Sequence, residues 1–241
     1  MRRDRLRVVG MQAVGPYTLV RLGRGRLQPG APGQFFMLEA PGRPLPRPFS
    51  LCTASAGELG FLVEPLGKGT TAIASLDVGD VIHVTGPLGR GFDLDVARPL
   101  LVGGGIGIVP LACWQDTVGG LALLGFRDER HAEAAELMSG EVELATDDGS
   151  SGHAGFVTEL LASALDRDPV VTVYACGPPP MLEGVRALCA ERGVPAQLAL
   201  ESGMACGFGA CFGCVVPTRT GYVRLCVDGP VLAAAELEAV A

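Results

Sequence analysis

The sequence predicts three consecutive parts: a small antiparallel β-barrel, a doubly wound parallel α/β domain and a short cysteine-rich module. Short segments with period-two alternation occupy residues 1–97, and strand and helix patterns alternate over residues 98–195. Residues 196–241 hold four closely spaced cysteines. Because a domain takes about 150 residues, a chain of 241 residues has room for two compact domains or one large one.

Composition excludes several classes of protein. With 48% hydrophobic and 19% charged residues the chain is expected to fold. Its net charge of -7 does not provide the basic surface that nucleic acid requires. The sequence contains no apolar run of about 18 residues that could span a membrane, and no apolar signal-peptide region follows the basic N-terminus. We therefore expect a cytoplasmic protein with reduced cysteines.

The barrel prediction depends on five short strand patterns separated by Gly and Pro turns, at residues 17–22, 34–38, 49–52, 59–63 and 81–84. This part also contains Arg47-Pro48-Phe49-Ser50 and, further on, Gly69-Thr70. An arginine beside a strand can pair with a pyrophosphate, an aromatic ring can stack on a flat cofactor, and a Gly-Thr turn can donate hydrogen bonds to phosphate. Taken singly, each is equally typical of an ordinary surface or turn.

The α/β prediction begins with a buried strand at residues 100–102, a glycine turn over residues 103–107 and a helix at residues 108–117. Further strands are expected at residues 121–124, 142–145 and 170–174, and helices at residues 131–138, 157–165 and 181–191. Ligands of such sheets bind at the carboxyl ends of the strands. Gly103, Gly104, Gly105 and Gly107 lie at one such end, and Cys176-Gly177-Pro178 at another. The glycine run is not a complete G-x-G-x-x-G, and the second segment alone could be only a tight turn.

The third part carries Cys206-x4-Cys211-x2-Cys214-x11-Cys226. The two spacings between the first three cysteines match the plant-type [2Fe-2S] pattern. A structural zinc site, usually built from paired C-x2-C arms, and a dithiol at Cys211 and Cys214 are the alternatives.

Together these segments resemble the ferredoxin-NADP reductase superfamily, and most closely its iron-sulfur electron-transfer subunits of type B dihydroorotate dehydrogenase. The resemblance implies a β-barrel flavin domain, an α/β nucleotide-binding domain and a C-terminal [2Fe-2S] module. It places FAD at Arg47, Pro48, Phe49, Ser50, Leu62, Val63, Glu64, Gly69 and Thr70. It places NAD at Gly103, Gly104, Gly105, Gly107, Cys176, Gly177 and Pro178, and the cluster ligands at Cys206, Cys211, Cys214 and Cys226.

The function that the resemblance implies is electron transfer in pyrimidine biosynthesis. Electrons would pass from the FMN of a dihydroorotate dehydrogenase catalytic subunit, in a heterotetramer, through the cluster and FAD to NAD⁺. A subunit of similar architecture in a sulfide dehydrogenase, a soluble hydrogenase or a bifurcating transhydrogenase is the alternative, and a non-enzymatic module with a zinc clasp is another.

The choice between NAD and NADP is expected to depend on the residues that follow the strand at residues 121–124. Asp128 and Glu129 would repel a 2′-phosphate, whereas Arg127 and Arg130 could bind one. NAD is favoured mainly through the resemblance.

Overall fold

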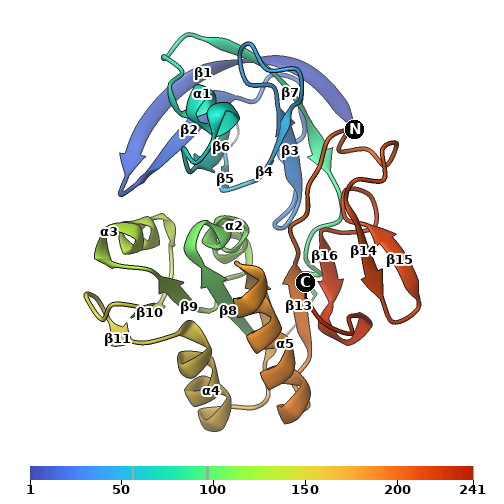
Figure 1. The fold of residues 1–241 in the computed structure, drawn as a ribbon. Coiled ribbons are helices and arrows are strands. Elements are labelled where there is room, and N and C mark those ends of the chain that lie inside the picture. The colour runs from blue at the N-terminus through green and yellow to red at the C-terminus, as the bar shows by residue number, and fades with distance from the viewer. Residues whose placement is uncertain (56, 96–97, 241) are drawn as a thin grey trace.

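The computed structural model describes residues 1–55, 57–95 and 98–240. Figure 1 shows the strands of the first part curled at one end of the molecule and the α/β part at the other, with a hairpin of the cysteine-rich segment beside them. Within the described residues, no helix is long and apolar enough to cross a membrane.

The first part is a curled antiparallel sheet with the strand order β4-β3-β7-β1-β2-β6-β5, which confirms the predicted barrel class. Its strands are β1 (Arg2–Val14), β2 (Tyr17–Gly23), β3 (Phe35–Leu38), β4 (Arg47–Ser50), β5 (Thr53–Ala54), β6 (Glu58–Val63) and β7 (Val81–Leu88), and its helix is α1 (Lys68–Ala74).

Two of these elements differ from the sequence-based expectation. Strand β1 was not expected, although Leu6 and Val8 alternate with arginines and point into the core while the arginines face solvent. Gly69 and Thr70 were expected in a simple turn but begin helix α1, where the Thr70 hydroxyl accepts a hydrogen bond from the Gly67 backbone N–H at 3.0 Å.

The second part is a mostly parallel sheet with the order β11-β10-β9-β8-β12-β13-β16, in which only the pair β13–β16 is antiparallel. This confirms the doubly wound class. The strands are β8 (Pro99–Gly104), β9 (Leu121–Phe126), β10 (Val142–Thr146), β11 (His153–Ala154), β12 (Thr172–Cys176), β13 (Ala196–Ala199) and β16 (Val231–Ala233). The helices are η1 (Gly105–Ile108), α2 (Val109–Val118), α3 (Glu129–Ala132), η2 (Glu133–Leu137), α4 (Val157–Arg167), α5 (Pro179–Arg192) and η3 (Ala234–Glu236).

Several elements of this part differ from the prediction. Strand β12 begins at Thr172 instead of residue 170, because Val170 lies outside the sheet with 68% of its surface exposed. The single helix expected at residues 131–138 is divided into α3 and η2. The chain leaves the sheet after β13 and returns to it as β16. In the sequence, the cysteine segment is therefore an insertion between two neighbouring strands of this sheet. The domain boundaries after residues 97 and 195 stay predictions.

Helix α2 lies between the α/β sheet and the barrel, whereas α4 and α5 cover the other face of the sheet (Figure 1). Side chains from both sides meet at this contact. Cys113 of α2 packs in the barrel core, and Cys52 of the barrel packs in the cluster that surrounds α2. Burial raises the pKa of both thiols to about 12, which agrees with an inert role for Cys113.

Candidate functional site

The site begins where the strand order of the α/β sheet reverses, between β8 and β12. The turn after β8 and the turn after β12 lie against each other there. A Cβ atom on Gly107 would stand 2.6 Å from the Cys176 carbonyl oxygen and from the Gly177 Cα and N atoms, so only glycine permits this approach. The two predicted nucleotide segments are thus brought together at the crevice where ligands of such sheets bind.

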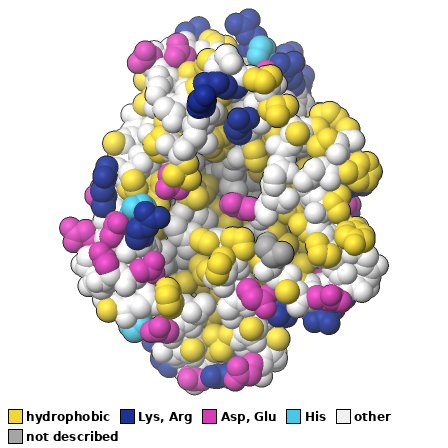
Figure 2. All heavy atoms as spheres, in the orientation of Figure 1, with side chains coloured by type: hydrophobic (Ala, Val, Ile, Leu, Met, Phe, Trp, Pro, Cys, Tyr) yellow, Lys and Arg dark blue, Asp and Glu magenta, His cyan; other side chains and the backbone are white. Residues whose placement is uncertain are grey.

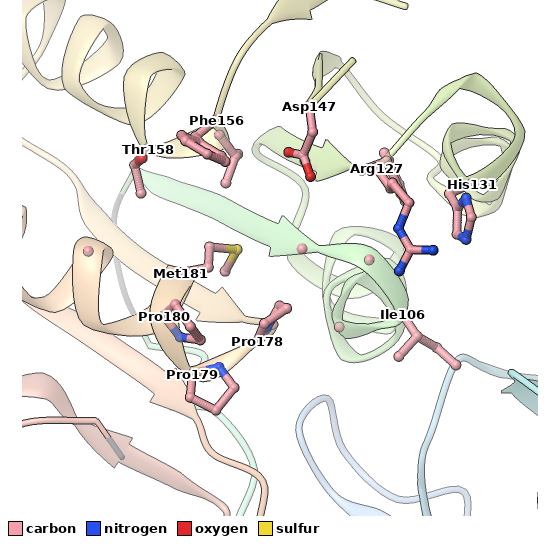
Figure 3. Close-up of a pocket in the computed structure, with 18 of the residues that line it drawn as sticks. Ile106, Arg127, His131, Asp147, Phe156, Thr158, Pro178, Pro179, Pro180 and Met181 are labelled. Carbon is pink, nitrogen blue, oxygen red and sulfur yellow. The ribbon is translucent and has the colours of Figure 1, made fainter. Parts of the chain in front are cut away.

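A cavity of about 720 Å³ opens over these two turns. Figure 3 shows Pro178, Ile106 and Arg127 around it, with Asp147 and Phe156 further along its wall. This volume lies within the range of about 300–1,000 Å³ typical of small-molecule sites. We call it the nucleotide cavity.

A second cavity of about 270 Å³ lies beside the barrel. It is lined by six of the residues that the resemblance assigned to the flavin: Pro48, Phe49, Ser50, Leu62, Glu64 and Thr70. We call it the flavin cavity. Glu64, Ile106 and Glu201 line both cavities, and we call these three the junction residues. Figure 2 shows an acidic side chain within the hollow between the two parts of the molecule.

Not every predicted residue reaches a cavity. Gly104, Gly105, Gly107, Gly177 and Pro178 line the nucleotide cavity. Val63, Gly103 and Cys176 are buried and line neither cavity. The Arg47 guanidinium lies over Gly69, at 2.9 Å from where a Cβ atom would stand, and donates to the Leu45 carbonyl at 2.8 Å. The binding roles of all these residues stay predictions.

The sequence analysis did not single out Glu201, because it belongs to no recognisable motif. Only its position after β13, where it lines both cavities, marks it. Glu201 is an exposed residue of the cavity walls, and partial desolvation there raises the pKa of its carboxyl group. Desolvation also raises the pKa of the buried Cys176 thiol well above its ordinary value. Ionisation of both groups is therefore less favourable than in water.

The cysteine segment is organised by a hairpin of β14 (Val215–Thr218) and β15 (Gly221–Arg224). Cys214 directly precedes this hairpin, and one residue separates the end of the hairpin from Cys226. Strand pairing therefore brings both cysteines to the same end of the hairpin. The Cys226 backbone N–H points at the Cys214 sulfur at 3.5 Å, and both thiols are buried. The x11 spacing of the sequence is thereby explained by a two-stranded turn.

Cys206 and Cys211 form a second pair, on the loop before the hairpin and nearer to solvent. Burial opposes ionisation of Cys206, but the N–H groups of Phe208, Cys211 and Ala210 and the Cys211 side chain outweigh it and lower its pKa to about 6. Burial raises the pKa of Cys226 to about 12, although the N–H of Gly209 points at its sulfur. Gly209 has a φ of 87°, a left-handed conformation that favours glycine.

The four cysteines fit a two-iron cluster as two pairs. Four thiolates shared between two irons leave two for each iron, and backbone N–H groups aimed at the sulfurs favour their charged form. Within the described ranges, no three His, Cys, Asp or Glu side chains are grouped as a single metal ion requires. A tetrahedral zinc site would instead need all four ligands around one point.

Comparison with known proteins identifies the cysteine segment and then the whole chain. Residues 201–238 match the iron-sulfur cluster binding domain of dihydroorotate dehydrogenase B. The electron transfer subunit of dihydroorotate dehydrogenase B (NAD(+)) from Geobacillus thermodenitrificans is 40% identical over 257 residues, which covers 98% of each chain. The corresponding subunit from Caldanaerobacter subterraneus is 38% identical over 215 residues, 86% of each chain. This chain belongs to the dihydroorotate dehydrogenase B electron transfer subunit family.

Solved structures agree with this family at the level of the fold. An NADH-dependent reduced ferredoxin-NADP oxidoreductase has a TM-score of 0.83 and 24% identity, covering 97% of this chain and 89% of its own. The ferredoxin reductase of carbazole 1,9a-dioxygenase has a TM-score of 0.70 and 26% identity, covering 80% of this chain and 66% of its own. Membership of the electron transfer subunit family confirms the predicted oxidoreductase class. The match of residues 201–238 supports an iron-sulfur cluster as a cofactor, and the fold is shared with a ferredoxin NADP⁺ reductase from Neisseria gonorrhoeae whose structure contains FAD and NADP.

Proposed function

We propose that this chain carries electrons from the FMN-containing catalytic subunit of a dihydroorotate dehydrogenase to NAD⁺, in the cytoplasm and within a heterotetramer. The observation that carries the proposal is that the nucleotide cavity, the flavin cavity and the cysteine segment adjoin one another in one chain. The nucleotide cavity shares three junction residues with the flavin cavity, and the flavin cavity is also lined by Met204, two residues before Cys206.

The flavin cavity fits the flat ring of FAD. Phe49 offers an aromatic face, Ser50 and Thr70 offer hydroxyls, and the cavity is too small for the whole dinucleotide. The Arg47 guanidinium lies over Gly69 outside the cavity, where it could pair with a pyrophosphate. When bound, FAD would couple one-electron exchange with the cluster to hydride transfer to NAD⁺.

The nucleotide cavity holds NAD in this proposal. Its glycine turn leaves room for a pyrophosphate beside the backbone N–H groups that begin η1 and α2. The junction residues would then surround the nicotinamide where it meets the flavin. Desolvation raises the pKa of Glu201 at this position.

The cysteine loop offers the face for the catalytic subunit. Cys211 is exposed on this loop, and Phe208 and Phe212 beside it are 53% and 63% exposed. Tyr222 of the adjacent hairpin is 80% exposed. Exposed aromatic side chains are enriched at protein interfaces, so a partner that covers them would place its own cofactor near the cluster.

A serine substitution at Cys211 tests the route. Cys211→Ser is expected to lose the cluster and electron exchange with the catalytic subunit, yet to keep FAD and NADH-driven reduction of an artificial dye. Iron content, flavin absorbance and the two rates are measured on the purified protein. The control is Cys113→Ala, which removes a buried thiol at the domain contact and should change neither rate.

Two outcomes would contradict the proposal. Wild-type protein that contains zinc and neither flavin nor iron would favour the non-enzymatic zinc module. Cys211→Ser protein that still exchanges electrons with the catalytic subunit would show that the cluster is not on the route. The runner-up, a subunit of another complex, is tested by replacing the catalytic subunit with other partners.

A further inference from the structure

The nucleotide cavity has two chemically different ends. The junction residues mark the end where nicotinamide must lie, because they also line the flavin cavity. The glycine turn that receives the pyrophosphate lies next to them. Arg127, Asp147 and Phe156 line the nucleotide cavity but not the flavin cavity, so this end of the cavity is left for the adenosine half (Figure 3).

The acidic residues expected from the sequence do not line the cavity there. Asp128 caps helix α3, where its Oδ1 accepts from the His131 backbone N–H at 3.0 Å and lies 2.7 Å from His131 Nδ1. Neither Asp128 nor Glu129 lines the nucleotide cavity. Direct contact of these two carboxylates with a bound nucleotide is therefore not supported, although Asp128 lies beside His131, which lines the cavity.

Asp147 occupies the place instead. It follows β10 at the carboxyl edge of the sheet, and its backbone N–H donates to the Phe126 carbonyl at 3.0 Å, which holds the end of β10 beside the end of β9. In Figure 3 its carboxylate points into the cavity, between Phe156 and Arg127. Over residues 1–55, 57–95 and 98–240, the Asp147 carboxylate accepts no hydrogen bond and joins no ion pair, so it is available to a ligand.

We infer that Asp147 selects NAD over NADP, an inference that rests on the proposed function of this cavity. Its carboxylate would accept hydrogen bonds from the hydroxyl groups of the adenosine ribose. The same carboxylate would repel a 2′-phosphate, which carries between one and two negative charges.

Arg127 makes the prediction more specific. Its guanidinium lines the same end of the cavity, and within the described part of the chain it has no carboxylate partner. Arginine is the side chain that accommodates a 2′-phosphate in related folds. Removing the charge of Asp147 therefore leaves Arg127 unopposed, so the variant should gain affinity for the phosphorylated nucleotide as well as lose selectivity.

Calorimetric titration of the purified holoprotein with ADP-ribose and with 2′-phospho-ADP-ribose measures this selectivity without any redox step. Wild type should prefer ADP-ribose. Asp147→Asn should lower the ratio of the two affinities by about tenfold or more, through tighter binding of the phosphorylated compound. Combining Asp147→Asn with Arg127→Gln should abolish that gain.

Asp148→Asn is the matched control. Asp148 is adjacent and carries the same side chain, but its Oδ1 is engaged by the Ser150 backbone N–H and hydroxyl at 2.9 and 2.6 Å, and it does not line the cavity. In Asp148→Asn, the ratio of the affinities for ADP-ribose and 2′-phospho-ADP-ribose should stay within about twofold of the wild-type ratio. An unchanged ratio in Asp147→Asn, or an equal change in Asp148→Asn, would overturn the inference and leave the proposed function standing. Failure of wild type to bind either compound would overturn the nucleotide site itself.

Discussion

The contact between the two turns of the nucleotide site predicts a strong effect of Gly107→Ala. The new methyl group would stand 2.6 Å from three backbone atoms of Cys176 and Gly177, whereas unstrained carbon contacts are about 3.5–4.0 Å. The turns must then separate by about 1 Å, and overpacking of this kind costs about 1–3 kcal/mol of folding free energy. A misplacement of about 1 Å also lowers the rate of hydride transfer by up to a hundredfold.

Urea denaturation and NADH-driven dye reduction measure these two effects. Gly23→Ala is the control, because its methyl group would lie 3.6 Å from the nearest atom, a side-chain carbon of Val9, on a strand that does not line the nucleotide cavity. This control should cost less than about 1 kcal/mol. If Gly107→Ala matches the control in both stability and rate, then the two turns do not form the floor of the nucleotide site.

Three further predictions concern the cluster loop and the junction. Arg224 lies 5.5 Å from the Phe212 ring centroid and donates to the Gly209 carbonyl at 3.4 Å, so it stabilises the cysteine loop. Arg224→Gln should remove about 1 kcal/mol of this stabilisation and make the cluster bleach a few-fold faster in air. An unchanged bleaching rate would contradict this role. The pKa of Glu201 is raised in the folded protein, so the free energy of unfolding falls as pH rises through that pKa. The apoprotein of Glu201→Gln should therefore have a higher melting temperature than wild type at about pH 8 and the same melting temperature near pH 4. An equal difference in melting temperature at both pH values would count against desolvation as the cause. In the apoprotein, the rate of alkylation of Cys206 should increase as the pH rises through about 6, whereas Cys113, with its pKa of about 12, should stay unreactive up to neutral pH. Mass spectrometry of the labelled peptides measures both. The reverse order of labelling would mean that the loop amides do not favour the Cys206 thiolate.

The sequence was sufficient where function depends on neighbours along the chain. The spacing of the four cysteines predicted their cluster, because a loop and one hairpin bring them into two pairs. The glycine turn after β8 was recognised for a similar reason, since close packing at a strand end requires glycine in a fixed local order.

The sequence was insufficient where function depends on distant elements. Asp128 stands where a ribose-binding carboxylate is expected after β9, yet a local hydrogen bond to His131 turns it into a helix cap. Asp147 reaches the cavity only because β10 pairs beside β9, and Glu201 only because β13 ends at the junction of two cavities. Such placements follow from sheet order, which no local pattern encodes.

The central claim is tested most directly by mixing the purified holoprotein with the FMN-containing catalytic subunit, dihydroorotate and NAD⁺, and recording NADH formation. The account predicts that NADH forms together with orotate only when both subunits are present, and that Cys211→Ser protein abolishes it. NADH formation by the catalytic subunit alone would contradict the account. So would its absence from the mixture while this chain still reduces a dye with NADH.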